Sequence, residues 1–158
     1  MRKLKVYLDT SVISHLHQLD APDKMNDTLA LWEEIKQGEY EVYLSQVTLD
    51  EVHRCNEEKL AILRQYMAQV QFTVLEIDSE IDKIARTFIA NNILKEKNID
   101  DCYHIACAMK NACDVIVSWN FKHIYNIKTI RGVKIVSGIT SYPEVAIYSP
   151  TILISGEE

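Results

Sequence analysis

Short apolar segments alternate along this chain with longer segments whose apolar residues recur at helical spacing. Strands that are joined by helices need right-handed crossovers, which place parallel strands in one sheet and cover both of its faces. The alternation therefore predicts a three-layer α/β/α fold around a parallel sheet of four to five strands. The predicted strands are Leu4–Leu8, Tyr40–Ser45, Phe72–Ile77, Asp114–Ser118 and Val133–Ser137.

The length of 158 residues suits a single domain with a substantial core. We expect one domain over residues 1–158, with a core over about residues 4–146 and a C-terminal extension over 147–158. The formal net charge of −6 argues against binding to nucleic acid through a broad basic surface. It does not exclude a site in which carboxylates gather a metal ion, because the cation reverses the local field.

The four cysteines contain no CxxC pair, and no apolar stretch approaches the length of a membrane helix. The apolar run behind the N-terminus stops at Asp9, which is too short for a signal peptide. We therefore expect reduced thiols, no membrane segment and a cytoplasmic location.

Polar residues follow several of the predicted strands, at the edge of the sheet where parallel α/β folds bind ligands. Asp9 ends the first strand, and Glu51 lies in the helix that follows the second. Asp101 opens the helix before the fourth strand, and Ser118 and Asn120 end that strand. These side chains are predicted to converge. Asp114 precedes the fourth strand and belongs to the opposite edge.

Each candidate also has a purely structural interpretation. Asp9 could cap the next helix, and Thr48 with Glu51 matches a capping box. Asp101 suits a helix N-terminus, and Asn120 suits a turn. However, carboxylates that converge repel one another and lose hydration unless a cation joins them. Three acids from three segments therefore favour a site for Mg²⁺ or Mn²⁺, which prefer oxygen ligands.

Four segments of the chain resemble, in order, the signature segments of PIN-domain ribonucleases, a family that includes the VapC-type toxins of bacterial toxin–antitoxin systems. These segments are YLDTSVIS, LSQVTLDEV, DDCYHIACAM and VIVSWNFKHI. The resemblance extends from Leu4 to about Ala146. It implies a Mg²⁺-dependent endoribonuclease that cleaves single-stranded RNA, with an antitoxin protein as partner and a homodimer as its assembly.

The resemblance places the catalytic positions on Asp9, Glu51, Asp101 and Asn120, of which the three acids would hold the metal. The fourth position is often an aspartate in the family, so Asn120 keeps a carbonyl ligand but removes one negative charge. This departure leaves one well-held metal ion and puts a second in doubt.

Five further residues are predicted to support the site or to contact RNA. Thr10 and Ser118 could position a metal-bound water or cap a helix. His104 lies three residues after Asp101, on the same helical face, and could orient the acids. The supporting set is Thr10, Ser118, His104, Lys122 and His123.

Three other functions remain to be weighed. A phosphatase of the haloacid-dehalogenase type needs a second acid two residues after the first, where this chain has Ser11. A receiver domain needs an acidic pair that is missing beside Asp9. The third is a catalytically inert PIN-like module that binds RNA or a protein partner, which the Asn120 departure and the acidic net charge favour.

Overall fold

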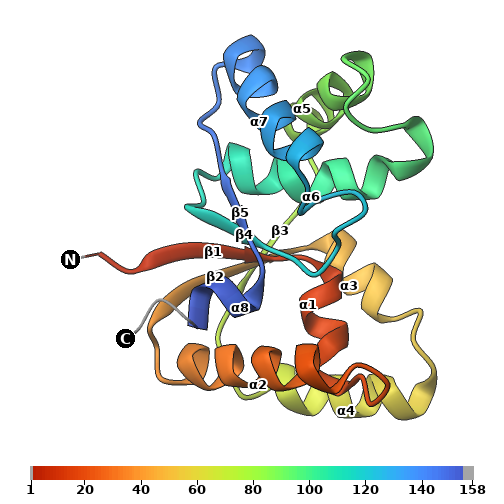
Figure 1. Ribbon diagram of the computed structural model, residues 1–158, viewed down its shortest axis with the longest axis vertical. Coiled ribbons are helices and arrows are strands. Elements are labelled where there is room, and N and C mark those ends of the chain that lie inside the picture. The colour runs from red at the N-terminus through yellow and green to blue at the C-terminus, as the bar shows by residue number, and fades with distance from the viewer. Residues whose placement is uncertain (1, 155–158) are drawn as a thin grey trace.

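A parallel sheet of five strands forms the middle of the computed structural model, which describes residues 2–154 (Figure 1). The strand order is β3-β2-β1-β4-β5, and every neighbouring pair is parallel. The predicted α/β class with a parallel sheet is confirmed. The strands are β1 (Leu4–Leu8), β2 (Tyr40–Ser45), β3 (Thr73–Leu75), β4 (Val115–Val117) and β5 (Ala146–Tyr148).

Helices cover both faces of the sheet, so the molecule has three layers (Figure 1). One face is covered by α1 (Thr10–Ser14), the 3-10 turn η1 (His15–His17), α2 (Pro22–Lys36) and α4 (Glu57–Met67), while α3 (Gln46–Val52) lies at the rim. The other face carries α5 (Ser79–Ala90), the 3-10 turn η2 (Glu96–Asn98), α6 (Ile99–Lys110) and α7 (Ile127–Thr140). The last helix, α8 (Pro150–Ile154), packs against α2.

The central strands are buried on both faces, which explains why they read as nearly continuous apolar runs. Val6 and Leu8 of β1 point into the core beneath α2. Tyr7, between them, points into the core beneath α6. β4 alternates in the same way, with Val115 and Val117 facing α2 and Ile116 facing α6. This alternation fixes which side chains reach each layer.

The predicted fifth strand is wrong. The segment Val133–Ser137 lies inside α7, and the last strand is instead β5, later in the chain. The alternating β-branched residues suggested a strand, but Asn126 caps a helix by accepting a hydrogen bond from the Thr129 amide. A glycine lets this helix approach closely, because a Cβ at Gly132 would lie 2.5 Å from Ile93 Cγ2. The buried face has helical spacing: Thr129, Gly132, Val133 and Val136.

The C-terminal extension that we expected begins inside β5 and continues into α8, and its residues 155–158 lie outside the described part. Within residues 2–154 no helix is both long and apolar enough to cross a membrane. The four cysteines are free thiols, and three of them are buried: Cys102, Cys107 and Cys113.

Candidate active site at the carboxyl ends of the strands

The site lies where the chain changes direction across the sheet. From β1 the chain proceeds outward to β2 and β3, and it then returns to place β4 on the other side of β1. In open parallel sheets such a switch point leaves a crevice beyond the carboxyl ends of the two central strands. Asp9 follows β1 and Ser118 follows β4, so these two residues stand at this switch point.

Asp9 is almost fully buried, with 2% of its surface exposed, and hydroxyl groups hold both of its oxygens. Oδ1 accepts hydrogen bonds from Ser11 Oγ at 2.6 Å and from the Val12 amide at 3.3 Å, so Asp9 does cap α1. Oδ2 accepts a bond from Ser118 Oγ. Burial raises the pKa of Asp9 above its usual range, although His104 and the two hydroxyls oppose that shift.

The Ser11 and Ser118 hydroxyls also join the segment after β1 to the segment after β4. Ser11 Oγ accepts a hydrogen bond from the Trp119 amide at 2.8 Å. Ser118 Oγ accepts one from the Asn120 amide, also at 2.8 Å. Because each hydroxyl binds Asp9 at the same time, the carboxylate and the segment after β4 are fixed relative to each other.

Glu51 points from α3 toward the start of α1. Its Oε1 accepts hydrogen bonds from the Thr10 hydroxyl and from His104 Nε2, the latter at 2.9 Å. The capping-box interpretation of Glu51 is wrong, because the box at the start of α3 is made by Ser45 and Thr48. Burial alone would raise the pKa of Glu51, but the bonds from His104 and Thr10 lower it below the usual value.

His104, on α6, stands among the three acids and is 2% exposed. Its Nδ1 lies 2.7 Å from the Tyr7 hydroxyl, and that hydroxyl donates to Ser45 Oγ at 2.7 Å. Tyr7 and Glu51 thus contact opposite nitrogens of the ring, and the imidazolium form would donate to both. Burial opposes this charge, but Glu51, Asp9 and Asp101 raise the pKa of His104 above its ordinary value.

Asp101 lies in the first turn of α6 and faces the loop after β4. Its Oδ2 lies 2.9 Å from His123 Nδ1, and its Oδ1 accepts a weaker bond from Asn120 Nδ2 at 3.3 Å. The side-chain oxygen of Asn120, Oδ1, accepts a hydrogen bond from the His123 backbone amide at 2.9 Å. Burial raises the pKa of Asp101, and the charges of Asp9 and Glu51 raise it further, against the lowering effect of His104 and His123.

The three acids therefore share one electrostatic environment, which His104 and His123 partly neutralise. Their carboxylate oxygens are the ligands that hard divalent cations prefer, and such a cation would offset the repulsion among them. In the described residues, however, no three His, Cys, Asp or Glu side chains are arranged to hold a metal ion. Local hydrogen bonds hold each carboxylate instead, so a bound ion would have to displace some of them.

The structure brings most of the predicted site residues together. Thr10, Ser118, His104 and His123 each contact an acid of the site. Lys122 contacts none of them and lines a neighbouring cavity.

Sequence reasoning missed the roles of Tyr7 and Ser11. Tyr7 precedes Asp9 by two residues, so strand alternation could have placed its ring on the same face of the sheet.

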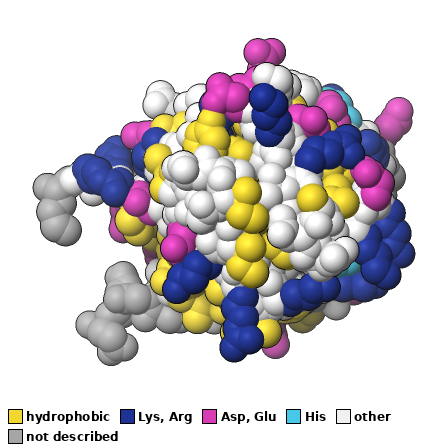
Figure 2. All heavy atoms as spheres, turned by 90° about the horizontal axis from the view of Figure 1, so that it is seen from above, with side chains coloured by type: hydrophobic (Ala, Val, Ile, Leu, Met, Phe, Trp, Pro, Cys, Tyr) yellow, Lys and Arg dark blue, Asp and Glu magenta, His cyan; other side chains and the backbone are white. Residues whose placement is uncertain are grey.

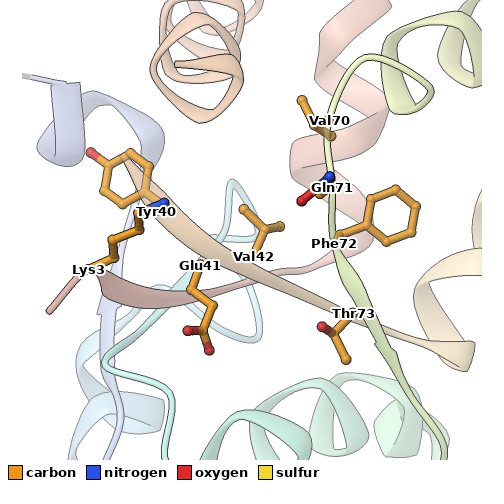
Figure 3. A pocket seen from close by; sticks show the side chains of 8 residues that line it. All are labelled: Lys3, Tyr40, Glu41, Val42, Val70, Gln71, Phe72 and Thr73. Carbon is orange, nitrogen blue, oxygen red and sulfur yellow. The ribbon is translucent and has the colours of Figure 1, made fainter. Parts of the chain in front are cut away.

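A different cavity, of about 600 Å³, lies at the opposite edge of the sheet (Figure 3). The start of β2 with Tyr40 and Glu41 lies on one side of it, and the segment Val70–Thr73 on the other. Because it lies at the amino ends of the strands, this cavity is separate from the three acids.

The chain belongs to the PIN domain family, whose model matches residues 6–125. PIN domains are typically nucleases, and nucleases of this family generally use divalent metals. None of the curated proteins in the comparison matches the sequence.

Two solved structures share the fold. VapBC2 from Rickettsia felis, bound to a DNA fragment from its promoter, aligns with a TM-score of 0.58 and 14% identity, over 92% of this chain and 98% of that chain. Mycobacterium tuberculosis VapC20, a toxin that cleaves the sarcin–ricin loop, aligns with a TM-score of 0.54 and 15% identity, over 70% of this chain and 86% of that chain. At these identities the likeness is one of fold.

Proposed function

We propose that this protein is a Mg²⁺- or Mn²⁺-dependent endoribonuclease that cleaves single-stranded RNA and acts as the toxin of a toxin–antitoxin pair. The observation that carries the proposal is the meeting of Asp9, Glu51 and Asp101, from three separate segments, at the switch point of the sheet. Within residues 2–154 no lysine or arginine forms an ion pair with any of the three. Membership of the PIN family and the VapC-like fold support this function.

In this proposal Asp9, Asp101 and Glu51 would hold the metal, and the side-chain carbonyl of Asn120 would be a further oxygen ligand. When bound, the ion lowers the pKa of a water molecule and offsets negative charge on the phosphate. The chain's own contribution is orientation. Attack of water in line with the leaving oxygen would produce a 5′-phosphate and a 3′-hydroxyl.

The orienting contacts are already present around two of the acids. His104 and Thr10 both donate to the same oxygen of Glu51, which leaves its Oε2 for a ligand. His123 pairs through Nδ1 with Asp101 Oδ2. These contacts are typical of the outer partners that fix metal-binding side chains.

A second candidate is an inert PIN-like module that binds RNA or a protein. Two observations favour it. The fourth position is Asn120, which donates to Asp101 through its amide, and both oxygens of Asp9 are occupied by hydroxyls. The antitoxin and the homodimer remain predictions that follow from the resemblance.

Cleavage of a mixed pool of single-stranded RNA, with and without Mg²⁺, separates the two candidates. We expect cleavage that needs Mg²⁺ in the wild type and none in Asp9→Asn, because the substitution removes a charge that would hold the ion. Circular dichroism should show that Asp9→Asn remains folded, because the variant also removes a repelling charge. Undiminished cleavage by Asp9→Asn would exclude the proposed site, and a wild type that binds RNA without cutting it would support the inert module.

A further inference from the structure

A basic cavity of about 600 Å³ lies beside the acidic site. One wall is the segment between α5 and α6, and the other is the segment that runs from the loop after β4 into α7. Four lysines line it, and no aspartate or glutamate is among the described residues of its wall. The charged and titratable residues of the lining are Lys95, Lys97, Lys122, His123 and Lys128.

The first wall directs its lysines toward the cavity and its acid away. Lys95 and Lys97 flank Glu96 in the sequence, but only the lysines line the cavity. Arg86 Nη1 on α5 binds both Glu96 oxygens, at 2.8 and 3.1 Å, and so holds that acid toward α5. Buried Ile93 and Leu94 anchor this wall in the core.

The second wall is held by one asparagine. Asn126 Nδ2 donates to the carbonyl groups of Phe121 and Lys122, at 3.1 and 2.9 Å. Its Oδ1 accepts from the Thr129 amide and begins α7. Asn126 therefore fixes both the turn that carries Lys122 and the helical turn that carries Lys128.

Within the described residues the four lysines have no carboxylate partners. Lys95, Lys97, Lys122 and Lys128 are exposed, and none of the ion pairs formed within residues 2–154 includes any of them. Figure 2 shows Lys and Arg side chains gathered at the right edge of the α5–α7 side of the molecule, where Figure 1 places these two segments. Such a cluster, in a chain with a net charge of −6, is suited to an anionic ligand.

The basic cavity adjoins the acidic site through a single side chain. His123 lines the cavity, and its Nδ1 also pairs with Asp101 at 2.9 Å. On the same loop Phe121 is 46% exposed and packs against Trp119 and Tyr125. Cations beside exposed aromatic rings are what proteins use to hold single-stranded nucleic acid.

We propose that the basic cavity is a subsite for a backbone phosphate of single-stranded RNA, next to the phosphate that is cleaved at the acidic site. This inference rests on the proposed function. Lysine ammonium groups bind phosphate oxygens as point charges and without regard to base sequence. The cavity therefore sets where the strand lies, while the acids act on the neighbouring linkage.

The test is the binding of a fluorescein-labelled RNA 12-mer of mixed sequence, measured by anisotropy in EDTA so that no cleavage occurs. The variant Lys95→Gln/Lys122→Gln removes one lysine from each wall. We expect affinity to fall about fivefold per lost contact at 0.1 M salt, and the slope of log affinity against log salt to become shallower by about 0.7 per contact. Lys95→Arg/Lys122→Arg keeps the charge and should bind like the wild type.

The matched control is Lys3→Gln/Lys83→Gln, which removes the same charge from exposed lysines outside this cavity. Its salt slope should equal that of the wild type. Equal weakening by both double variants would reduce the effect to net charge, and no weakening by the Lys95/Lys122 pair would overturn the subsite. Equal loss of affinity for a labelled polyglutamate peptide would assign the cavity to acidic protein instead.

The binding test is independent of catalysis. If the wild type never cuts RNA but the Lys95/Lys122 double variant binds RNA more weakly, the subsite is supported and the nuclease proposal is excluded. If the wild type cuts RNA but both double variants bind RNA equally well, the nuclease proposal is supported and the subsite is excluded.

Discussion

Asp114 and Asp9 lie at opposite ends of the strands, and their pKa values are shifted in opposite directions. Asp114, at the amino end of β4, accepts hydrogen bonds from both terminal nitrogens of Arg2, at 2.8 Å each, and from the Lys5 amide. These contacts lower the pKa of Asp114 to about 2. Asp9, at the carboxyl end of β1, has a raised pKa because it is buried without a lysine or arginine partner among residues 2–154.

The comparison separates an acid whose charge is matched by its neighbours from acids whose charge is matched only in part. Asp114 joins β4 to the start of β1, and its charge is matched where it stands. Asp9, Asp101 and Glu51 are matched only in part, by two histidines. A surplus of negative charge at a ligand-binding edge is a feature of functional sites.

The largest expected difference between the two edges is in catalysis. We expect Asp101→Asn to lower Mg²⁺-dependent RNA cleavage by more than about 100-fold, because it removes a metal-binding charge. Asp114→Asn should leave the rate unchanged. Initial rates on one labelled RNA would check both, and similar losses in the two variants would erase the distinction between the edges.

A fourth acid at the carboxyl edge should increase the electrostatic difference between the two edges. Asn120→Asp replaces an amide that donates to Asp101 with a repelling carboxylate. Without metal we expect the melting temperature to fall by about 3 °C for about 1 kcal/mol of added repulsion. Mn²⁺ should restore it and should raise the Tm of this variant more than that of the wild type.

Thermal melts with EDTA and with Mn²⁺ measure this effect, and the control is Asn56→Asp, an exposed position where aspartate can still accept the capping bond from the Lys59 amide. An Asn120→Asp protein that gains no more from Mn²⁺ than the control would show that the fourth position lies outside the metal site.

The smallest effect concerns acid stability. The pKa of Asp114 is about 2 in the folded protein, below the ordinary value of 3.8, so its contribution is present above about pH 4 and is lost as the pH falls through 2. We expect Asp114→Asn to lower the free energy of unfolding by about 1 kcal/mol at neutral pH, since solvent reaches this pair. The difference from the wild type should shrink between pH 4 and pH 2.

At the carboxyl ends of the strands, the pH dependence of stability should have the opposite sign. The folded pKa of Asp101 is raised, so its ionised form destabilises the protein at neutral pH and this penalty is relieved as the pH falls toward the unfolded value. Urea unfolding of Asp101→Asn at neutral pH should therefore show no loss of stability. A loss as large as that of Asp114→Asn would mean that Asp101 is a structural acid as well.

The sequence was sufficient for features that depend on periodicity and chain order. Four strands, and the place of Asp9 at the end of the first, follow from apolar runs and from the geometry of parallel sheets. The segment Val133–Ser137 was misassigned because its β-branched residues favour a strand locally. Burial of Val133 and Val136 beside α5 and α6 overrides that preference.

Side-chain direction and the meeting of distant loops could not be predicted. The contacts of Tyr7 with His104 and of Ser11 with Trp119 depend on orientations that spacing does not specify. The basic cavity depends on two segments about 30 residues apart, and on Arg86, which holds Glu96 away from the two lysines that flank it.

One contact in the core lies directly behind the basic cavity. Ile93 lines the cavity and also touches Gly132 of α7, where even a methyl group would collide with it. The wall that carries Lys95 and the helix that carries Lys128 are therefore spaced by a glycine that meets no ligand. A Cβ at position 132 would force Ile93 to shift, so a residue buried in the hydrophobic layer bears on the shape of the cavity above it.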